Sequence, residues 1–262
     1  MMDYAEFQKQ VRLSKQDICR EVYADNRKSI RVKNEHTVVK NLERIFSATL
    51  KIANKKGFQA MSMRDLGRET NLSMGALYSY FSGKEELLAI LQHQRRTMTK
   101  RILQEHIDKE ADPTARLRAA ILTHLYLSEA MQPWFYFSYM EAKNLSKKEQ
   151  ALAVASELYT EKIFADILIQ GQAGGSFSPC DPQLTASVIK AMVQDWYLKR
   201  SKYANRKISV DQYARFILQI VESFISDVKE NRQSPGHTGE DMDGQYPSNG
   251  AKSNLWAVRE LD

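Results

Sequence analysis

Apolar residues recur three and four residues apart through most of this chain, which is the spacing of one face of an α-helix. The short-range alternation of apolar and polar positions that is typical of strands is absent from the pattern. Glycine and proline, which interrupt regular elements, are scarce before position 170. The pattern predicts an all-α protein of about nine helices, with a possible extra helix at the N-terminus.

Cap residues give the predicted helices their ends. Gly57 stops a first helix expected over 37–55. Ser62, with Asp65 three residues later, forms a capping-box pattern for a short helix over 63–70. Ser73 caps another short helix, expected over 74–81. Longer helices are predicted over 84–108, from Pro113 onward, and over 147–169, 182–203 and 209–230.

The two short helices have the spacing of a helix-turn-helix. Leu66, Leu72 and Leu77 are expected to point inward. Gly67 costs about 1 kcal/mol in a helix interior, so we expect a crossing helix to approach closely there. Asn71 falls where the turn needs a left-handed residue, which asparagine tolerates better than most.

A dense, ordered set of residues in this region resembles the N-terminal DNA-binding domain of TetR-type (TetR/AcrR) transcriptional regulators. The resemblance covers about 38–90 and rests on Gly57-Phe58, on 62–66 and 72–78, on Tyr80-Phe81, and on 84–87. The string over 195–200 is also similar to one in the penultimate helix of some members. The resemblance implies a helix-turn-helix domain, a larger helical regulatory domain, and a homodimer that binds double-stranded DNA.

The residues of the second short helix suit contact with a DNA groove. Gly75 and Ala76 are small enough for the helix tip to approach base edges, and Ala76 can touch a thymine methyl. Phosphate contacts would fix register rather than read sequence. The expected DNA-binding residues are Ser62, Arg64, Ser73, Met74, Gly75, Ala76, Tyr78, Ser79, Tyr80 and Lys84. Packing for the two tyrosines, and pairing of Arg64 with an acidic neighbour, are the alternatives.

These features divide the chain into four parts. An N-terminal extension over 1–35 precedes a DNA-binding domain over 36–84 and a ligand-binding and dimerisation domain over 85–231. The remainder, 232–262, is rich in Gly, Ser, Pro, Asn and Asp and is expected to be disordered. The extension could be a loosely docked helix, or its basic segment 27–33 could reach the DNA minor groove.

The resemblance implies an effector pocket in the larger domain, where aromatic residues are dense after Pro133. The predicted ligand-binding residues are His124, Trp134, Phe135, Phe137, Tyr139, Met140, Glu141, Asp195 and Trp196, and a hydrophobic small molecule is the expected effector. Ordinary core packing is the alternative for this cluster. The helices over 182–203 and 209–230 are expected to form a four-helix bundle with a second copy.

Composition narrows the function classes. The formal net charge of +6 is compatible with a polyanionic partner. Cys19 and Cys180 form no paired motif, and the five histidines no ligand cluster, so we expect no metal and no cofactor. With no catalytic motif, signal peptide or membrane span, the sequence predicts a cytoplasmic regulator that is not an enzyme. A repressor released by its effector is the favoured reading; an architectural DNA-binding protein without an effector and a ligand-responsive activator are the alternatives.

Overall fold

The computed structural model describes residues 2–11 and 15–226, and every regular element in them is helical. The predicted all-α fold is therefore confirmed. The helices are α1 (Tyr4–Val11), α2 (Lys15–Asp25), α3 (Glu35–Lys56), α4 (Met63–Thr70), α5 (Met74–Leu77), α6 (Lys84–Ile107), α7 (Pro113–Ala130), α8 (Gln132–Met140), α9 (Lys147–Ala173), α10 (Pro182–Leu198), α11 (Arg200–Asn205) and α12 (Val210–Ser226), with a 3₁₀ turn at Ala142–Asn144.

Several predicted bounds need correction. The described residues hold twelve α-helices rather than about nine with one extra, because the extension forms two helices and the helix expected over 182–203 is split into α10 and α11. The helix expected over 74–81 ends at Leu77, where backbone bonds from Ser79 to Ala76 and from Tyr80 to Leu77 tighten into a 3₁₀ turn. The predicted disordered tail and the last residues of the 209–230 helix lie outside the described residues.

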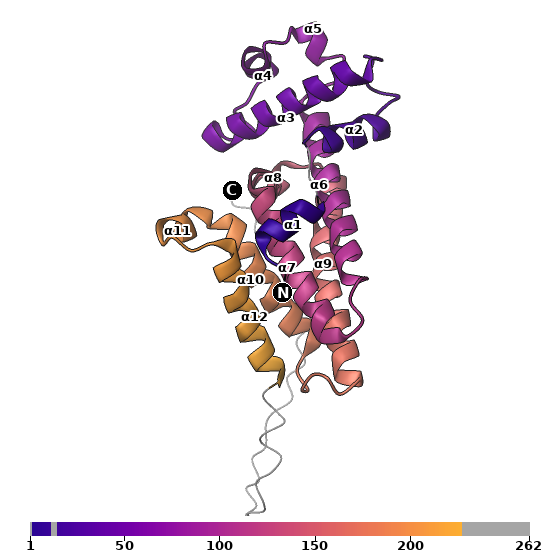
Figure 1. Ribbon diagram of the computed structural model, residues 1–262. Coiled ribbons are helices and arrows are strands. Elements are labelled where there is room, and N and C mark those ends of the chain that lie inside the picture. Colours follow the sequence, from indigo (N-terminus) through magenta and orange to yellow (C-terminus); the bar gives the residue numbers. More distant parts are fainter. Residues whose placement is uncertain (1, 12–14, 227–262) are drawn as a thin grey trace, which may run out of the picture.

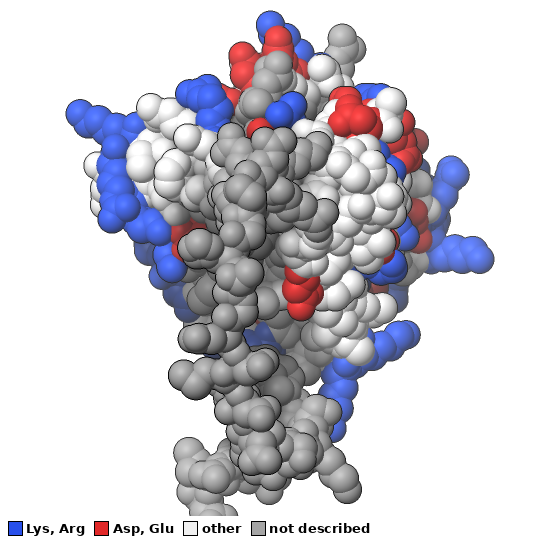
Figure 2. All heavy atoms as spheres, turned by 90° about the horizontal axis from the view of Figure 1, so that it is seen from below, with Lys and Arg blue, Asp and Glu red and all other residues white. Residues whose placement is uncertain are grey.

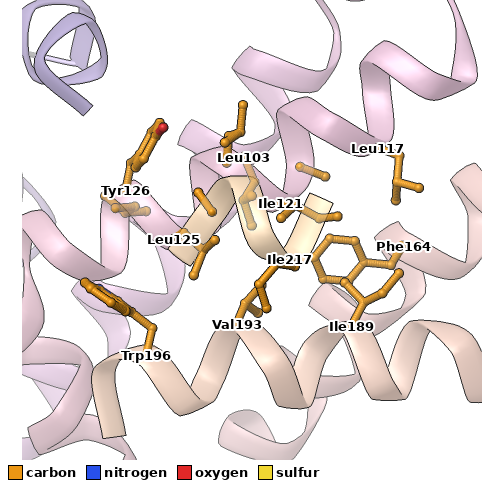
Figure 3. Close-up of a cluster of buried hydrophobic side chains, with 14 of the residues drawn as sticks. Leu103, Leu117, Ile121, Leu125, Tyr126, Phe164, Ile189, Val193, Trp196 and Ile217 are labelled. Carbon is orange, nitrogen blue, oxygen red and sulfur yellow. The ribbon is translucent and has the colours of Figure 1, made fainter. Parts of the chain in front are cut away.

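Figure 1 shows α3, α4 and α5 at one end of the molecule, away from the bundle that contains α7, α9, α10 and α12, and each of these parts has its own hydrophobic core. One core joins α2 to α5 with the first turns of α6, and the other is built by α7, α9, α10 and α12 with the rest of α6. The long helix α6 belongs to both, since Leu87 and Leu91 are buried in the first and Ile102 and Leu103 in the second. Figure 3 shows the second core, in which Ile121 and Leu125 of α7 lie among side chains from α9, α10 and α12.

The N-terminal extension docks on both cores. Phe7 of α1 is fully buried against the rings of His106 and Tyr126 in the larger core. Cys19 and Val22 of α2 are buried in the smaller core, beside α3. Its two helices are therefore part of the fold. The arm interpretation of the basic segment 27–33 stays a proposal.

Candidate nucleic-acid interface and effector site

Hydrogen bonds at the start of α4 fix the supporting helix. The Ser62 hydroxyl accepts from the Asp65 backbone N–H at 3.1 Å, and the Asp65 carboxylate accepts from the Ser62 N–H at 2.9 Å. The predicted capping box is therefore confirmed. Lys56 and Arg68 also donate to Asp65, and these bonds with those from Ser62 hold the pKa of its carboxyl well below the ordinary value.

The turn between α4 and α5 has the geometry that its residues predict. Asn71 adopts the left-handed conformation, with φ of 53°. A Cβ on Gly67 would lie 3.1 Å from the carbonyl oxygen of Leu72, so the expected close approach is made by the chain just after the turn. Arg44 of α3 donates to the Thr70 carbonyl at the end of α4. Together these contacts set the angle between the two short helices.

The tip of α5 presents small and polar groups. Ser73 caps the helix by accepting from the Ala76 N–H at 3.1 Å. Ser73 and Gly75 are exposed, Met74 and Ala76 are partly exposed, and nothing lies within 4 Å of a Cβ built on Gly75. This surface is open to a partner that approaches the helix N-terminus.

The residues that follow the tip divide into surface and core. Tyr78 is 46% exposed, so its side chain is open to a contact between its hydroxyl and a phosphate. Tyr80 is only 2% exposed, and its hydroxyl accepts a hydrogen bond from the Asn41 amide at 2.8 Å. The prediction that Tyr80 contacts phosphate is wrong for this structure, because the side chain joins the turn to α3. Ser79 is partly buried and its hydroxyl donates to the Ala76 carbonyl.

Two predicted phosphate-binding cations differ in their surroundings. Arg64 is exposed, and no ion pair in the described part of the chain holds it; Asp65 pairs with Arg68 instead. Lys84 donates to the Gln59 carbonyl at 2.9 Å and lies over the Phe58 ring. Lys84 thus ties α6 to the loop before α4, and Arg64 is the freer of the two.

The predicted ligand residues do not gather in one cavity, which corrects that expectation. Phe137 lies edge-on to Phe58 in the smaller core, and Glu141 is buried there. Tyr139 and Met140 are exposed. The reason is that α8 carries aromatic residues on all sides, so its turns point them toward different parts of the molecule.

The remaining candidates have local partners. Trp196 is fully buried and its indole N–H donates to Glu129 at 3.0 Å. Asp195 accepts from Lys199 and Lys202, and these bonds, with that from Tyr203, outweigh burial and hold the pKa of its carboxyl below the ordinary value. Neither side chain points into a cavity that the structure shows.

Trp134 lines a cavity of about 590 Å³ between the extension and both cores. Phe7 and Ile18 from the extension form one wall, Phe46 and Leu50 of α3 form another, and the Trp134 ring meets Phe46 edge-on. The sequence alone could not reveal it, because its walls come from segments about 120 residues apart.

Around Phe135 the structure gathers charged groups that the sequence pattern missed. The Arg95 guanidinium lies 5.6 Å from the ring centre of Phe135, and the His124 ring lies 6.0 Å away. The ammonium of Lys190 is 3.2 Å from Nε2 of His124 and 3.3 Å from the Glu157 carboxylate. Phe135 and His124, which are both predicted ligand-binding residues, are therefore neighbours. Arg95 and Lys190 beside them were not predicted, because the sequence does not distinguish them from other charged residues on helices.

Two neighbouring helices leave apolar side chains in solvent. Leu184 and Val188 on α10 are 64% and 52% exposed, and Phe216, Ile220 and Phe224 on α12 are 60%, 42% and 57% exposed. Spacings of four residues place each set on one helix face. Exposed apolar side chains that are grouped on one face are typical of an association surface.

Figure 2 views the end of the molecule far from α4 and α5, where Lys and Arg lie mainly at the margins and uncharged surface fills much of the described area. Among the described residues, no cluster of potential metal ligands is present, and no helix is long and apolar enough to cross a membrane.

Comparison with known proteins matches two family models to this chain. Residues 45–91 match the model of bacterial regulatory proteins of the tetR family, and residues 110–221 match a tetracyclin repressor-like C-terminal domain. The HTH-type transcriptional regulator HbdR of Aromatoleum sp. (strain CIB) is 22% identical over 203 residues, which cover 78% of this chain and 88% of HbdR.

Solved structures share the fold. The ketosteroid transcriptional regulator KstR2 of Mycobacterium tuberculosis has a TM-score of 0.62 at 20% identity, over 75% of this chain and 97% of that one. AibR, solved in complex with isovaleryl coenzyme A and operator DNA, has a TM-score of 0.61 at 19% identity, over 69% of this chain and 97% of that one.

Proposed function

The chain belongs to the TetR family of DNA-binding transcriptional regulators, and on that premise we propose that it binds a near-palindromic operator as a homodimer and is released by a hydrophobic small-molecule effector. Repression is the favoured outcome of binding, and we expect the protein to act in the cytoplasm. The observation that carries the proposal is the open tip of α5, where Ser73, Gly75 and Ala76 face outward from a rigid turn.

Each part of the tip has a role in DNA recognition. Small side chains let the helix N-terminus enter a major groove, where Ala76 would meet a thymine methyl. Tyr78 and Arg64 would reach flanking phosphates, which fix orientation but carry no sequence information. Ser62, Ser79 and Lys84 would support the tip from within, as their hydrogen bonds to neighbouring backbone indicate.

The exposed apolar face of α10 and α12 supports the homodimer. Packing the same pair of helices from a second copy against it would form a four-helix bundle and remove those side chains from water. The symmetry of such a dimer places two recognition helices on one side of the DNA about one helical turn apart, so a near-palindromic operator follows.

The effector would act through the contacts between the two cores. AibR was solved with a coenzyme A thioester and its operator, which supports a ligand-responsive function in this chain as well. A ligand that binds one arrangement of the cores better than the other would shift the dimer away from the DNA-binding spacing. An activator would use the same sites, and the consequence for transcription would differ.

Selection from random duplex DNA tests the proposal. We expect the wild-type protein to enrich one near-palindromic sequence and the Ala76→Glu variant to enrich none, because a carboxylate at the tip repels DNA. Thr97→Glu, at an exposed site on α6, is the matched control and should enrich the wild-type sequence. Binding without any enriched sequence would instead favour an architectural protein, and binding by Ala76→Glu would contradict this docking.

A further inference from the structure

Arg95 of α6 is a partly buried cation with no anionic partner among the described residues, beside Phe135 of the larger core. In the described part of the chain no hydrogen bond or ion pair reaches its guanidinium, and its Nε atom is buried. Arg96, the next residue, shows the usual solution: it pairs with Glu149 at 3.2 Å. Burying the Nε–H without an acceptor is costly, so this guanidinium favours an acceptor from elsewhere.

The nearby acidic groups are already engaged. Glu157 accepts from Lys190 at 3.3 Å and from the Gln194 amide at 2.8 Å. Glu161 accepts from the Ser187 hydroxyl of α10. Neither carboxylate therefore compensates Arg95 through a direct contact.

His124 adds a second unpaired donor beside the Phe135 ring. Its Nε2 accepts from the Lys190 ammonium, which leaves Nδ1 as the N–H donor, and Nδ1 is buried with no partner. Burial and the charges of Lys190 and Arg95 lower the pKa of His124, so the ring is neutral. The hydroxyl of Thr99, one turn of α6 from Arg95, is also buried and unbonded.

We propose that Arg95, Lys190 and His124 bind the carboxylate of a monocarboxylic acid whose apolar body packs against Phe135 and Tyr197. This inference rests on the proposed function, for which it names the effector class. The site lies where α6, α7, α8, α9 and α10 converge, and the Phe135 and Tyr197 rings are 5.3 Å apart. Arg95 is partly exposed, so its end of the site is reachable from solvent.

The charge and shape of the donors select a carboxylate. Arginine binds carboxylates through two parallel hydrogen bonds from its planar fork. One unpaired cation matches the single negative charge of a carboxylate, whereas a phosphate carries up to two at neutral pH. The flanking aromatic rings favour an aryl or alkyl body over a polar one.

Paired probes test the site in the full-length protein. Thermal unfolding is followed with sodium phenylacetate and sodium octanoate, with the corresponding neutral amides, and with sodium chloride at equal ionic strength. At ten times the dissociation constant, a bound acid should raise the melting temperature by about 3 °C or more. We expect one or both acids to give this shift, and the amides and chloride to give none.

Two variants locate the effect. Arg95→Gln should weaken binding of the acid about tenfold or more, because it removes a charge-assisted pair. Arg96→Gln is the matched control, and it should keep the response because its guanidinium already has a partner. A response to neither acid, equal shifts from the amides, or a shift that survives in Arg95→Gln would overturn the inference. Phenylacetyl-CoA and octanoyl-CoA, which lack the free carboxylate, serve as further probes, and a response to them alone would also overturn the inference.

Operator binding by the same samples separates this inference from the proposed function. Specific DNA binding with no response to either acid would overturn the carboxylate site and leave the regulator intact. A response to the acid that depends on Arg95, in a protein that selects no DNA sequence, would uphold the site and overturn the proposed function.

Discussion

The Glu141 carboxylate accepts a hydrogen bond from the backbone N–H of Phe58 at 3.3 Å, across 83 positions of sequence. Both residues are buried, with exposed fractions of 8% and 1%. Phe58 precedes α4 and Glu141 follows α8, so this bond directly joins the DNA-binding end to the larger domain.

Removing the Glu141 carboxylate should destabilise the protein. In Glu141→Ala the Phe58 N–H stays buried without an acceptor, and we expect the free energy of unfolding to fall by about 1–3 kcal/mol. Urea denaturation followed by circular dichroism measures it. Glu110→Ala, at an exposed carboxylate, should stay within about 0.5 kcal/mol of wild type. Equal effects of the two substitutions would show that the bond to Phe58 contributes nothing.

Two glycines of the helix-turn-helix should respond to alanine in opposite ways. Gly75→Ala meets open space and should stabilise α5 by about 0.5 kcal/mol, yet weaken operator binding because the tip becomes bulkier. Gly67→Ala places a Cβ against the Leu72 carbonyl and should cost about 1 kcal/mol net. Thermal unfolding and DNA titration of the pair measure both effects; tighter binding by Gly75→Ala would contradict the proposed docking.

Arg64 should contribute to DNA affinity without contributing to specificity. Arg64→Ala should weaken binding to all duplexes and reduce the slope of log affinity against log salt by about one. Fluorescence anisotropy over a range of salt concentrations measures the slope. Lys109→Ala removes an exposed positive charge two residues after the C-terminal end of α6, and its slope should equal that of wild type. An unchanged slope in Arg64→Ala would mean that this guanidinium stays away from the phosphates.

His124 should make stability fall in mild acid. Burial, together with Lys190 and Arg95, lowers its pKa in the folded state, so below about pH 6.5 the unfolded chain binds a proton that the native protein does not. His124 should then cost up to about 1.4 kcal/mol of stability per pH unit, until the folded pKa is reached. Urea denaturation between pH 8 and pH 5 should show a shallower loss in His124→Asn. The exposed His93→Asn should behave as wild type, and identical curves for all three would contradict this origin.

Phe216 should be needed for the homodimer. Phe216→Asp places a charge on the apolar face, and we expect a monomer by light scattering together with loss of operator binding. Thr97→Glu, which changes an exposed residue on α6, should stay dimeric. A dimeric Phe216→Asp variant would place the interface elsewhere.

The accuracy of the sequence predictions follows the range of the interactions. Ser62 with Asp65, and Asn71 in the turn, act over a few residues, so the local pattern was enough to predict them. The burial of Tyr80 has no local signal, because its partner Asn41 lies 39 positions away. Arg95 left no signal, since its lack of a partner depends on where other helices place their carboxylates.

The aromatic cluster failed as a prediction for a different reason. The aromatic residues are dense, as the sequence shows, but density along a helix does not specify one face. Trp134 faces the cavity beside the extension, Phe135 the larger core and Phe137 the smaller one. Because α8 contributes side chains to all three surroundings, the role of each aromatic residue can be assigned only when the packing of the neighbouring helices is known.

The extension has a consequence for how the molecule comes apart. Phe7 of α1 is buried in one core, and Cys19 and Val22 of α2 are buried in the other. Unfolding of either core therefore exposes apolar residues of the extension to water while the other core still binds the rest of it. We expect heat or denaturant to unfold the intact chain in a single cooperative transition. Calorimetry of a chain that lacks residues 1–34 should show two separated transitions, because the connection between the two cores then rests mainly on α6 and α8.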